Sequence, residues 1–196
     1  MKTSDQILKI KSTILYILEK FPEGIDYIRL FKIMYFAQRQ HLVVYGSPLM
    51  EDTFVARKLG PVPAFSYKVM KYKEGALLDK CVITDELKDV ADSISISVLG
   101  DIQMVKKESD VMFDSDELSV SNIKMLDESI EFCKNKDSKE LSQLSHDKAW
   151  QFSDKIYKET GENVPMTYYK IAEAGNATKA MLKVIKERQM IKADLC

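Results

Sequence analysis

The residues that could carry chemistry in this chain are few and scattered. Its two histidines, His41 and His146, lie more than a hundred positions apart, and neither belongs to an H-E-x-x-H pattern. A metal site needs several histidine, cysteine or carboxylate ligands at close spacing, and the sequence offers no such cluster. It also contains no G-x-S-x-G nucleophile motif and no glycine-rich phosphate loop. We therefore predict no catalytic residue, no metal, no cofactor, and a protein that is not an enzyme.

One acidic cluster, formed by Asp114, Asp116 and Glu117, has the residue types that acid and base catalysis uses. These carboxylates lie in a polar segment, which favours solvated side chains over catalytic ones. A small-molecule enzyme that uses His146 and nearby carboxylates stays open as the weakest alternative.

Composition predicts one folded domain with a terminal extension. The chain has 196 residues, of which 45% are hydrophobic and 30% charged, and a net charge of −1. A net charge this close to zero gives no overall electrostatic attraction to nucleic acid or to anionic lipid. Charge is segregated, however, because residues 108–131 contain eight acids and one lysine, whereas residues 176–196 contain five basic residues and two acids. Segments of this kind are more often solvated faces than docking patches.

Cysteine usage and hydropathy predict a cytoplasmic protein. The three cysteines, Cys81, Cys133 and Cys196, are odd in number and widely spaced, which suits a reducing compartment. The amino terminus enters an amphipathic pattern without a signal-peptide core, and no window approaches eighteen uninterrupted apolar residues. We expect a protein that is neither exported nor inserted in a membrane.

Apolar residues at steps of three and four predict helices along most of the chain. The first is expected between a cap at Ser4 or Asp5 and a stop at residues 21–24, and the second from Asp26 to the break at residues 46–48. Later helices are expected at residues 63–72, 123–133, 138–144, 150–156, 165–174 and 176–191, with Ser138 and Pro165 opening two of them.

Strand signals are confined to two short regions. Residues 53–58 have extended character, and Gly60-Pro61-Val62-Pro63 is predicted to be a stiff turn. Alternating serine and aliphatic residues at 93–98, a Gly-Asp turn and residues 102–105 predict a β-hairpin. The predicted fold class is mainly α (α+β): a single helical domain with a small β-hairpin or short antiparallel sheet and additional C-terminal helices.

Three sequence blocks carry more information together than any single residue. They are Lys32-Ile33-Met34-Tyr35-Phe36-Ala37-Gln38 with His41, then Gly46-Ser47-Pro48-Leu49 with residues 54–62, and finally residues 141–150. Their order and spacing resemble the Panacea antitoxin domain family, also called SocA-like or GepA-like. The motifs that match are Tyr-Phe-Ala-Gln, Phe-x-Ala-x-x-x-Gly-Pro-Val, and Leu-x-x-Leu-x-His followed by Trp. We expect a Panacea-like domain at residues 1–160, and a helical extension at 161–196 packed on the same body.

The resemblance implies an antitoxin of a bacterial or phage toxin–antitoxin system, with a role in phage defence, that neutralises its cognate toxin by protein binding. Family members act against unrelated toxins, so membership does not name this one. An adaptor that hands the toxin to a protease, a DNA-binding regulator of its own operon that uses the basic last helix, and a homo-oligomer all stay open. Otherwise nucleic acid is an unlikely partner.

The resemblance and the residue types together nominate two sets of site residues. Residues expected to contact the partner are Tyr35, Gln38, His41, Arg57, Lys58, Lys183 and Arg188. Residues expected to form the structural motif are Phe36, Phe54, Gly60, Pro61, Leu144, His146 and Trp150. By their types alone, Tyr35, Phe36 and Trp150 are more often core residues, and the two histidines more often hydrogen-bonded structural ones. Arg57 departs from the family pattern, which often has an aromatic residue there.

Overall fold

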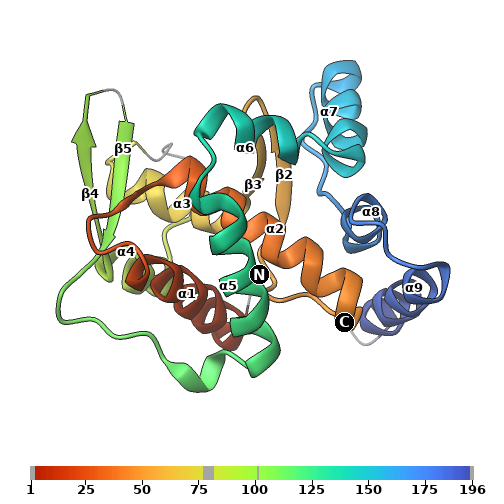
Figure 1. The fold of residues 1–196 in the computed structure, drawn as a ribbon, viewed down its shortest axis with the longest axis horizontal. Helices are drawn as coiled ribbons and strands as arrows, with labels where there is room; N and C mark the ends of the chain where they lie inside the picture. Colours follow the sequence, from red (N-terminus) through yellow and green to blue (C-terminus); the bar gives the residue numbers. More distant parts are fainter. Residues whose placement is uncertain (1–2, 77–81, 101, 195–196) are drawn as a thin grey trace.

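A long central helix, α2 (Tyr27–Tyr45), organises the computed structural model, which describes residues 3–76, 82–100 and 102–194 (Figure 1). The structure is 61% helical, with one three-stranded and one two-stranded antiparallel sheet among these residues. The predicted mainly α class with a short antiparallel sheet is confirmed.

The elements follow one another in a simple order along the chain. They are α1 (Ser4–Glu19), β1 (Ile25–Asp26), α2, β2 (Phe54–Arg57), β3 (Gly60–Pro63), α3 (Ala64–Lys73), α4 (Asp85–Asp92), β4 (Ile94–Leu99), β5 (Ile102–Lys107), a 3₁₀ turn (Ser115–Glu117), α5 (Val120–Lys134), α6 (Ser138–Ser145), α7 (Lys148–Thr160), α8 (Tyr168–Ala174) and α9 (Lys179–Asp194).

The central helix is buried along most of its length. Asp26 caps its start by accepting a 2.8 Å hydrogen bond from Arg29 N, and Gly46, at φ +62°, ends it. Every residue from Leu30 to Gln38 is buried, which is the pattern of a helix surrounded by core. Helices α1, α5, α6 and α8 and strand β3 all pack against it. The apolar side chains of this stretch and its polar side chains, Lys32, Tyr35 and Gln38, are therefore enclosed by other elements of the chain.

The larger sheet has the order β1-β5-β4, and its β4–β5 hairpin stands out from one side of the molecule (Figure 1). The hairpin confirms the prediction made from the alternating serines. Gly100 adopts φ +62° in its turn, as two-residue hairpin loops require. Strand β1 was not predicted, because two residues are too few to show a periodicity. Helix α4 was overlooked, although Leu87, Val90 and Ala91 have helical spacing behind a cap at Thr84.

Residues 60–63 form a strand, so the predicted turn there was wrong. Strand β3 pairs antiparallel with β2, with Arg57 opposite Gly60 and Phe54 opposite Pro63, and the turn lies at residues 58–59. The ring of proline fixes φ near a value that extended chain also uses, so prolines fit a short strand that has few ladder bonds to donate.

The residues predicted to cap or open three helices differ from those in the structure. Thr3 caps α1, Asp137 caps α6 and Thr167 caps α8, each through a side-chain oxygen that accepts a main-chain N–H. Pro165 instead lies in an isolated β-bridge with Val55. Several capping residues stand side by side in these stretches, and periodicity alone does not choose among them.

The segment after residue 160 lies against the rest of the chain at several points. Met166 N donates to Phe54 O at 2.8 Å, α8 packs on α2, and Arg188 Nη1 donates to Gly46 O at 3.0 Å. The domain boundary at residue 160 stays a prediction. No helix within the described ranges is both long and apolar enough to cross a membrane.

Gln38 provides the first test of this arrangement. Its side chain is fully buried on α2, where Oε1 accepts from Leu49 N at 2.9 Å and Met50 N at 3.1 Å, and Nε2 donates to Met50 O. The substitution Gln38→Leu keeps the volume but leaves these main-chain groups unpaired. We expect it to lower the free energy of unfolding by about 2–5 kcal/mol, because each unpaired buried group costs roughly 1–3 kcal/mol.

Urea denaturation would measure this loss. Gln40 is exposed on the same helix, so Gln40→Leu is the matched control and should change stability by less than about 0.5 kcal/mol. Equal effects of the two substitutions would contradict the role given to Gln38.

Candidate functional site

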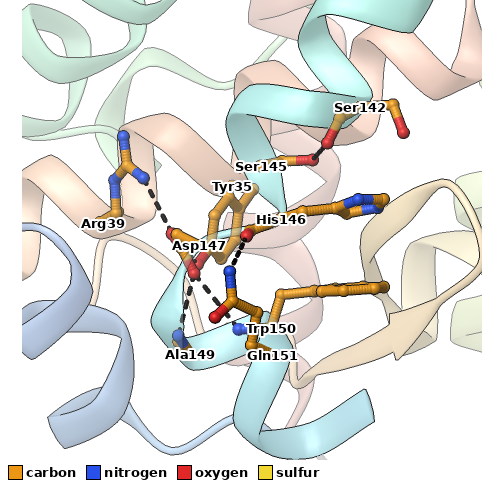
Figure 2. Close-up of polar contacts among 9 residues, drawn as sticks. All are labelled: Tyr35, Arg39, Ser142, Ser145, His146, Asp147, Ala149, Trp150 and Gln151. Atoms are coloured by element: carbon orange, nitrogen blue, oxygen red, sulfur yellow. Dashed lines mark hydrogen bonds and ion pairs between the residues drawn. The ribbon is translucent and has the colours of Figure 1, made fainter.

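The three sequence blocks meet at one place, where α2, the β2–β3 hairpin and the corner between α6 and α7 come together (Figure 2). The Tyr35 hydroxyl on α2 donates to Asp147 Oδ2 at 2.8 Å. The Trp150 indole Nε1 on α7 donates to the carbonyl oxygen of Arg57 at 3.0 Å. Residues more than ninety positions apart in sequence are thus joined by direct hydrogen bonds.

Asp147 connects two helices through its two carboxylate oxygens. Oδ2 accepts from Tyr35 and from Arg39 Nη1, both at 2.8 Å, and Oδ1 accepts from the main-chain N–H groups of Ala149 and Trp150 at 3.0 and 3.2 Å (Figure 2). It therefore caps α7 and ties that helix to α2. Burial, reinforced by the nearby Asp147 charge, holds the pKa of Tyr35 well above its ordinary value, so Tyr35 stays a neutral donor.

Trp150 stacks on His146, with ring centroids 3.7 Å apart and planes inclined by 17°. Figure 2 shows both rings pointing from the α6–α7 corner toward the hairpin. Burial, and after it the charge of Lys32, lowers the pKa of His146, so the ring meets the indole uncharged. The buried His146 Nε2 has no hydrogen-bond partner among the described residues, which contradicts our expectation of a fully hydrogen-bonded histidine.

Lys32 lies behind the hairpin and is almost completely buried. Its Nζ donates to the Pro61 carbonyl oxygen at 2.9 Å, and burial, opposed by the charge of Asp26, lowers its pKa to about 7. Gly60 must approach this group closely: it has φ +107°, and an added Cβ would lie 2.7 Å from Lys32 Nζ and would also clash with Ser145 Oγ. Glycine is thus required both by backbone conformation and by space.

On its outer side the same hairpin borders an open groove. Arg57 and Lys58 are exposed at its tip, and α7 forms the opposite wall. The groove has a volume of about 420 Å³ and is lined by Ala56, Arg57, Lys58, Trp150, Asp154, Tyr157 and Lys158.

Comparison with known proteins identifies the domain that carries this site. The family model described as "Antitoxin SocA-like, Panacea domain" matches residues 30–151, which is more than half of the chain. The chain belongs to this antitoxin family. The matched range includes all three sequence blocks, which confirms the resemblance. No curated protein and no solved structure matches the chain.

Three residues predicted to contact a partner lie in the interior of this Panacea domain. Tyr35 and Gln38 are 0% exposed and His41 is 4% exposed. His41 Nδ1 lies 2.7 Å from Ser47 O, and Nε2 lies 3.2 Å from Asn122 Nδ2, an arrangement that suits a neutral imidazole protonated on Nδ1. Burial lowers the pKa of His41 in agreement with this. These positions give a partner no access in this conformation, so the three residues are better assigned to the scaffold.

The four basic residues predicted to contact a partner are exposed, but they occupy two separate places. Arg57 and Lys58 lie at the hairpin, near the first half of α2, whereas Lys183 and Arg188 lie on α9 at the end of α2. Residues 32 and 45 of α2 mark these two ends, about 20 Å apart at 1.5 Å per residue. Arg188 also donates to the carbonyl oxygen of Gly46, so it has a structural contact.

Most of the expected structural residues are enclosed, with one exception. Phe36 and Phe54 belong to the core and Gly60 and Pro61 are buried, while Trp150 and His146 are partly buried. Leu144 is 46% exposed, because Leu141 and Ser145, one helical turn apart, form the inward face of α6. Leu144, named as part of the structural motif, therefore lies on the outward face of α6.

Sequence reasoning missed the two charged residues that organise the site. Lys32 and Asp147 were present in the blocks but were not singled out. A lysine inside the apolar run Leu30 to Ala37, and an aspartate directly before a helix, are the signals that point to them. Within the described ranges, no group of three or more histidine, cysteine or carboxylate side chains has the geometry to hold a metal ion.

Lys32 makes the stability of the domain depend on pH. Its pKa falls from 10.5 when unfolded to about 7 when folded, so the unfolded chain holds the extra proton between these values. Stability is consequently greatest above the unfolded pKa and is lost as pH falls toward 7. We expect the stability of the wild type relative to Lys32→Met to increase between pH 7 and 9.5, as measured by urea denaturation. A difference that stays constant across this range would contradict a buried, easily deprotonated Lys32.

Asp147→Ala removes the carboxylate that joins α2 to α7. The substitution leaves the Tyr35 hydroxyl unpaired in the core, which costs roughly 1–3 kcal/mol. It also removes a helix cap, which costs about 1 kcal/mol. We expect thermal and urea unfolding to show a loss of about 2–4 kcal/mol. Glu159→Ala, at an exposed site near the end of α7, is the control and should be nearly neutral. A comparably small effect of Asp147→Ala would show that the connection is not important for stability.

Proposed function

We propose that this chain is an antitoxin that neutralises its cognate toxin by binding and occluding it. The observation that carries the proposal is the family match across residues 30–151, the part of the chain that forms the junction described above. Within that junction, the polar side chains of Tyr35, Arg39 and Asp147 are engaged with one another and with main-chain groups. Such engagement supports a rigid scaffold for binding, and we propose that neutralisation needs no catalysis by this chain.

A rigid surface suits tight binding, because little conformational freedom is lost when the partner arrives. A standard interface buries about 1,600 Å² in total, which a body of this size can supply. We place the complex in the cytoplasm. The free thiol of Cys133 is buried, and burial raises its pKa to about 11, which makes it an unreactive core residue suited to a reducing compartment.

The alternative of a DNA-binding regulator receives less support from α9. Lys183 Nζ lies 3.8 Å from Glu187 Oε1, and Arg188 is directed at the end of α2. Basic residues that read DNA have to be free to contact phosphates. The second alternative, a protease adaptor, differs from a direct inhibitor in that the amount of toxin in the cell would fall.

The test is co-expression of this chain with the product of the adjacent reading frame, carrying an affinity tag. We expect that the adjacent product alone arrests growth, that co-expression restores growth, and that the two proteins co-purify as a stoichiometric complex. Immunoblotting should show unchanged amounts of the toxin. Restored growth with loss of the toxin would indicate an adaptor, and restored growth without a complex would refute direct binding.

A further inference from the structure

We propose that the groove between the β2–β3 hairpin and α7 is the toxin-docking site, and that it receives an acidic peptide segment of the toxin. This inference rests on the proposed function and adds to it a surface and a partner chemistry. It is carried by an aromatic side chain held in one position next to two cations that have no internal counter-charge.

The aromatic wall of the groove is rigid. Trp150 is fixed on one face by the His146 stack at 3.7 Å and at its Nε1 by the 3.0 Å bond to the Arg57 carbonyl oxygen, and its main-chain N–H is held by Asp147. Figure 2 shows the two parallel rings extending together from the α6–α7 corner. An aromatic residue that is already immobilised loses little entropy on binding, which is a property of residues that dominate binding energy.

The cations at the mouth of the groove are available for a partner. Arg57 and Lys58 are exposed and form no ion pair within the part of the chain that the structure describes. On the opposite wall, Lys158 Nζ lies 2.6 Å from Asp154 Oδ2, so that pair is internally neutralised. The net charge of the groove therefore comes from Arg57 and Lys58, and its complement is a segment bearing carboxylates.

The groove fits a short stretch of polypeptide. A volume of about 420 Å³ accommodates a few side chains, and Trp150, Asp154 and Lys158 also border a second hollow along α7. Tyr157 is 42% exposed and extends the aromatic surface. A nucleic-acid backbone would instead require a longer basic track than the two cations Arg57 and Lys58 supply. The occupant that suits both the two cations and the aromatic wall is an acidic segment that also places an apolar side chain on Trp150.

Charge reversal tests the electrostatic part of the proposal. The probe is the purified product of the adjacent reading frame, added to the full-length chain. We expect Arg57→Glu with Lys58→Glu to weaken binding at least tenfold and to reverse the groove's contribution to the salt dependence of the affinity, because salt then screens a repulsion. The control is Lys179→Glu with Lys186→Glu, two exposed cations on α9 that make the same change in net charge. It should bind within about twofold of the wild type, and both variants should melt within a few degrees of it.

The single tryptophan provides a direct readout of the groove. Because Trp150 is the only tryptophan, a chain labelled with 5-fluorotryptophan gives one ¹⁹F resonance, whatever the partner contains. Titration with the unlabelled probe should shift or broaden that resonance for the wild type and the α9 control, with much weaker effects for the hairpin variant.

Each outcome decides between the two proposals. If the wild type binds the probe but the hairpin variant binds equally well, or the ¹⁹F resonance does not change at saturation, the groove assignment is wrong while the antitoxin function stands. If the wild type neither binds nor neutralises the probe, the proposed function itself fails. If the hairpin substitutions reduce retention on DNA and leave probe binding unchanged, the groove serves nucleic acid and the acidic-segment proposal is overturned.

Discussion

The partly buried carboxylate of Asp147 is the group on which the rest of the site depends. It accepts donors from α2 through Tyr35 and Arg39 and from the start of α7 through main-chain N–H groups. Without it, the direction in which α7 leaves the core would be set only by the Trp150–Arg57 hydrogen bond and by apolar packing, which is non-directional. The positions of Trp150, its stack on His146 and the groove beyond it all follow from that direction.

A second constraint comes from placing polar side chains on an almost fully enclosed helix. Burying an unpaired polar group is costly, so Lys32, Tyr35 and Gln38 must each find a partner on a distant element. Their partners lie on β3, before α7 and in the loop after α2 respectively. Each pairing fixes one neighbouring segment relative to α2. The polar core thereby selects a single arrangement of hairpin, loop and helix that apolar contacts alone would leave less specific.

Helical periodicity and hairpin alternation were enough to predict the fold class, since these patterns are local. Tertiary contacts were not predictable in the same way. The Gly-Pro-Val-Pro run became a strand because it pairs with β2 across a two-residue turn and because Lys32, which is distant in sequence, donates to the Pro61 carbonyl oxygen. Tyr35, Gln38 and His41 have residue types that suit an interface, but the face of α2 that carries them is enclosed. Arg57 and Arg188 carry the same charge, and only the fold shows that they belong to different surfaces.

The contact between Trp150 and the hairpin separates the fixed part of the proposed docking groove from its variable part. The indole donates to the main-chain oxygen of residue 57, a group that every amino acid supplies, so the anchor does not depend on the Arg57 side chain. Position 57 can therefore vary in charge or aromatic character without moving the tryptophan beside it. The resemblance noted at the outset implies an aromatic residue at this position in many family members. Here a cation stands there instead, next to a second cation at Lys58. Since recognition of a partner is a difference of affinities, a variable side chain beside a rigid aromatic wall is a place where specificity can change at little cost in stability.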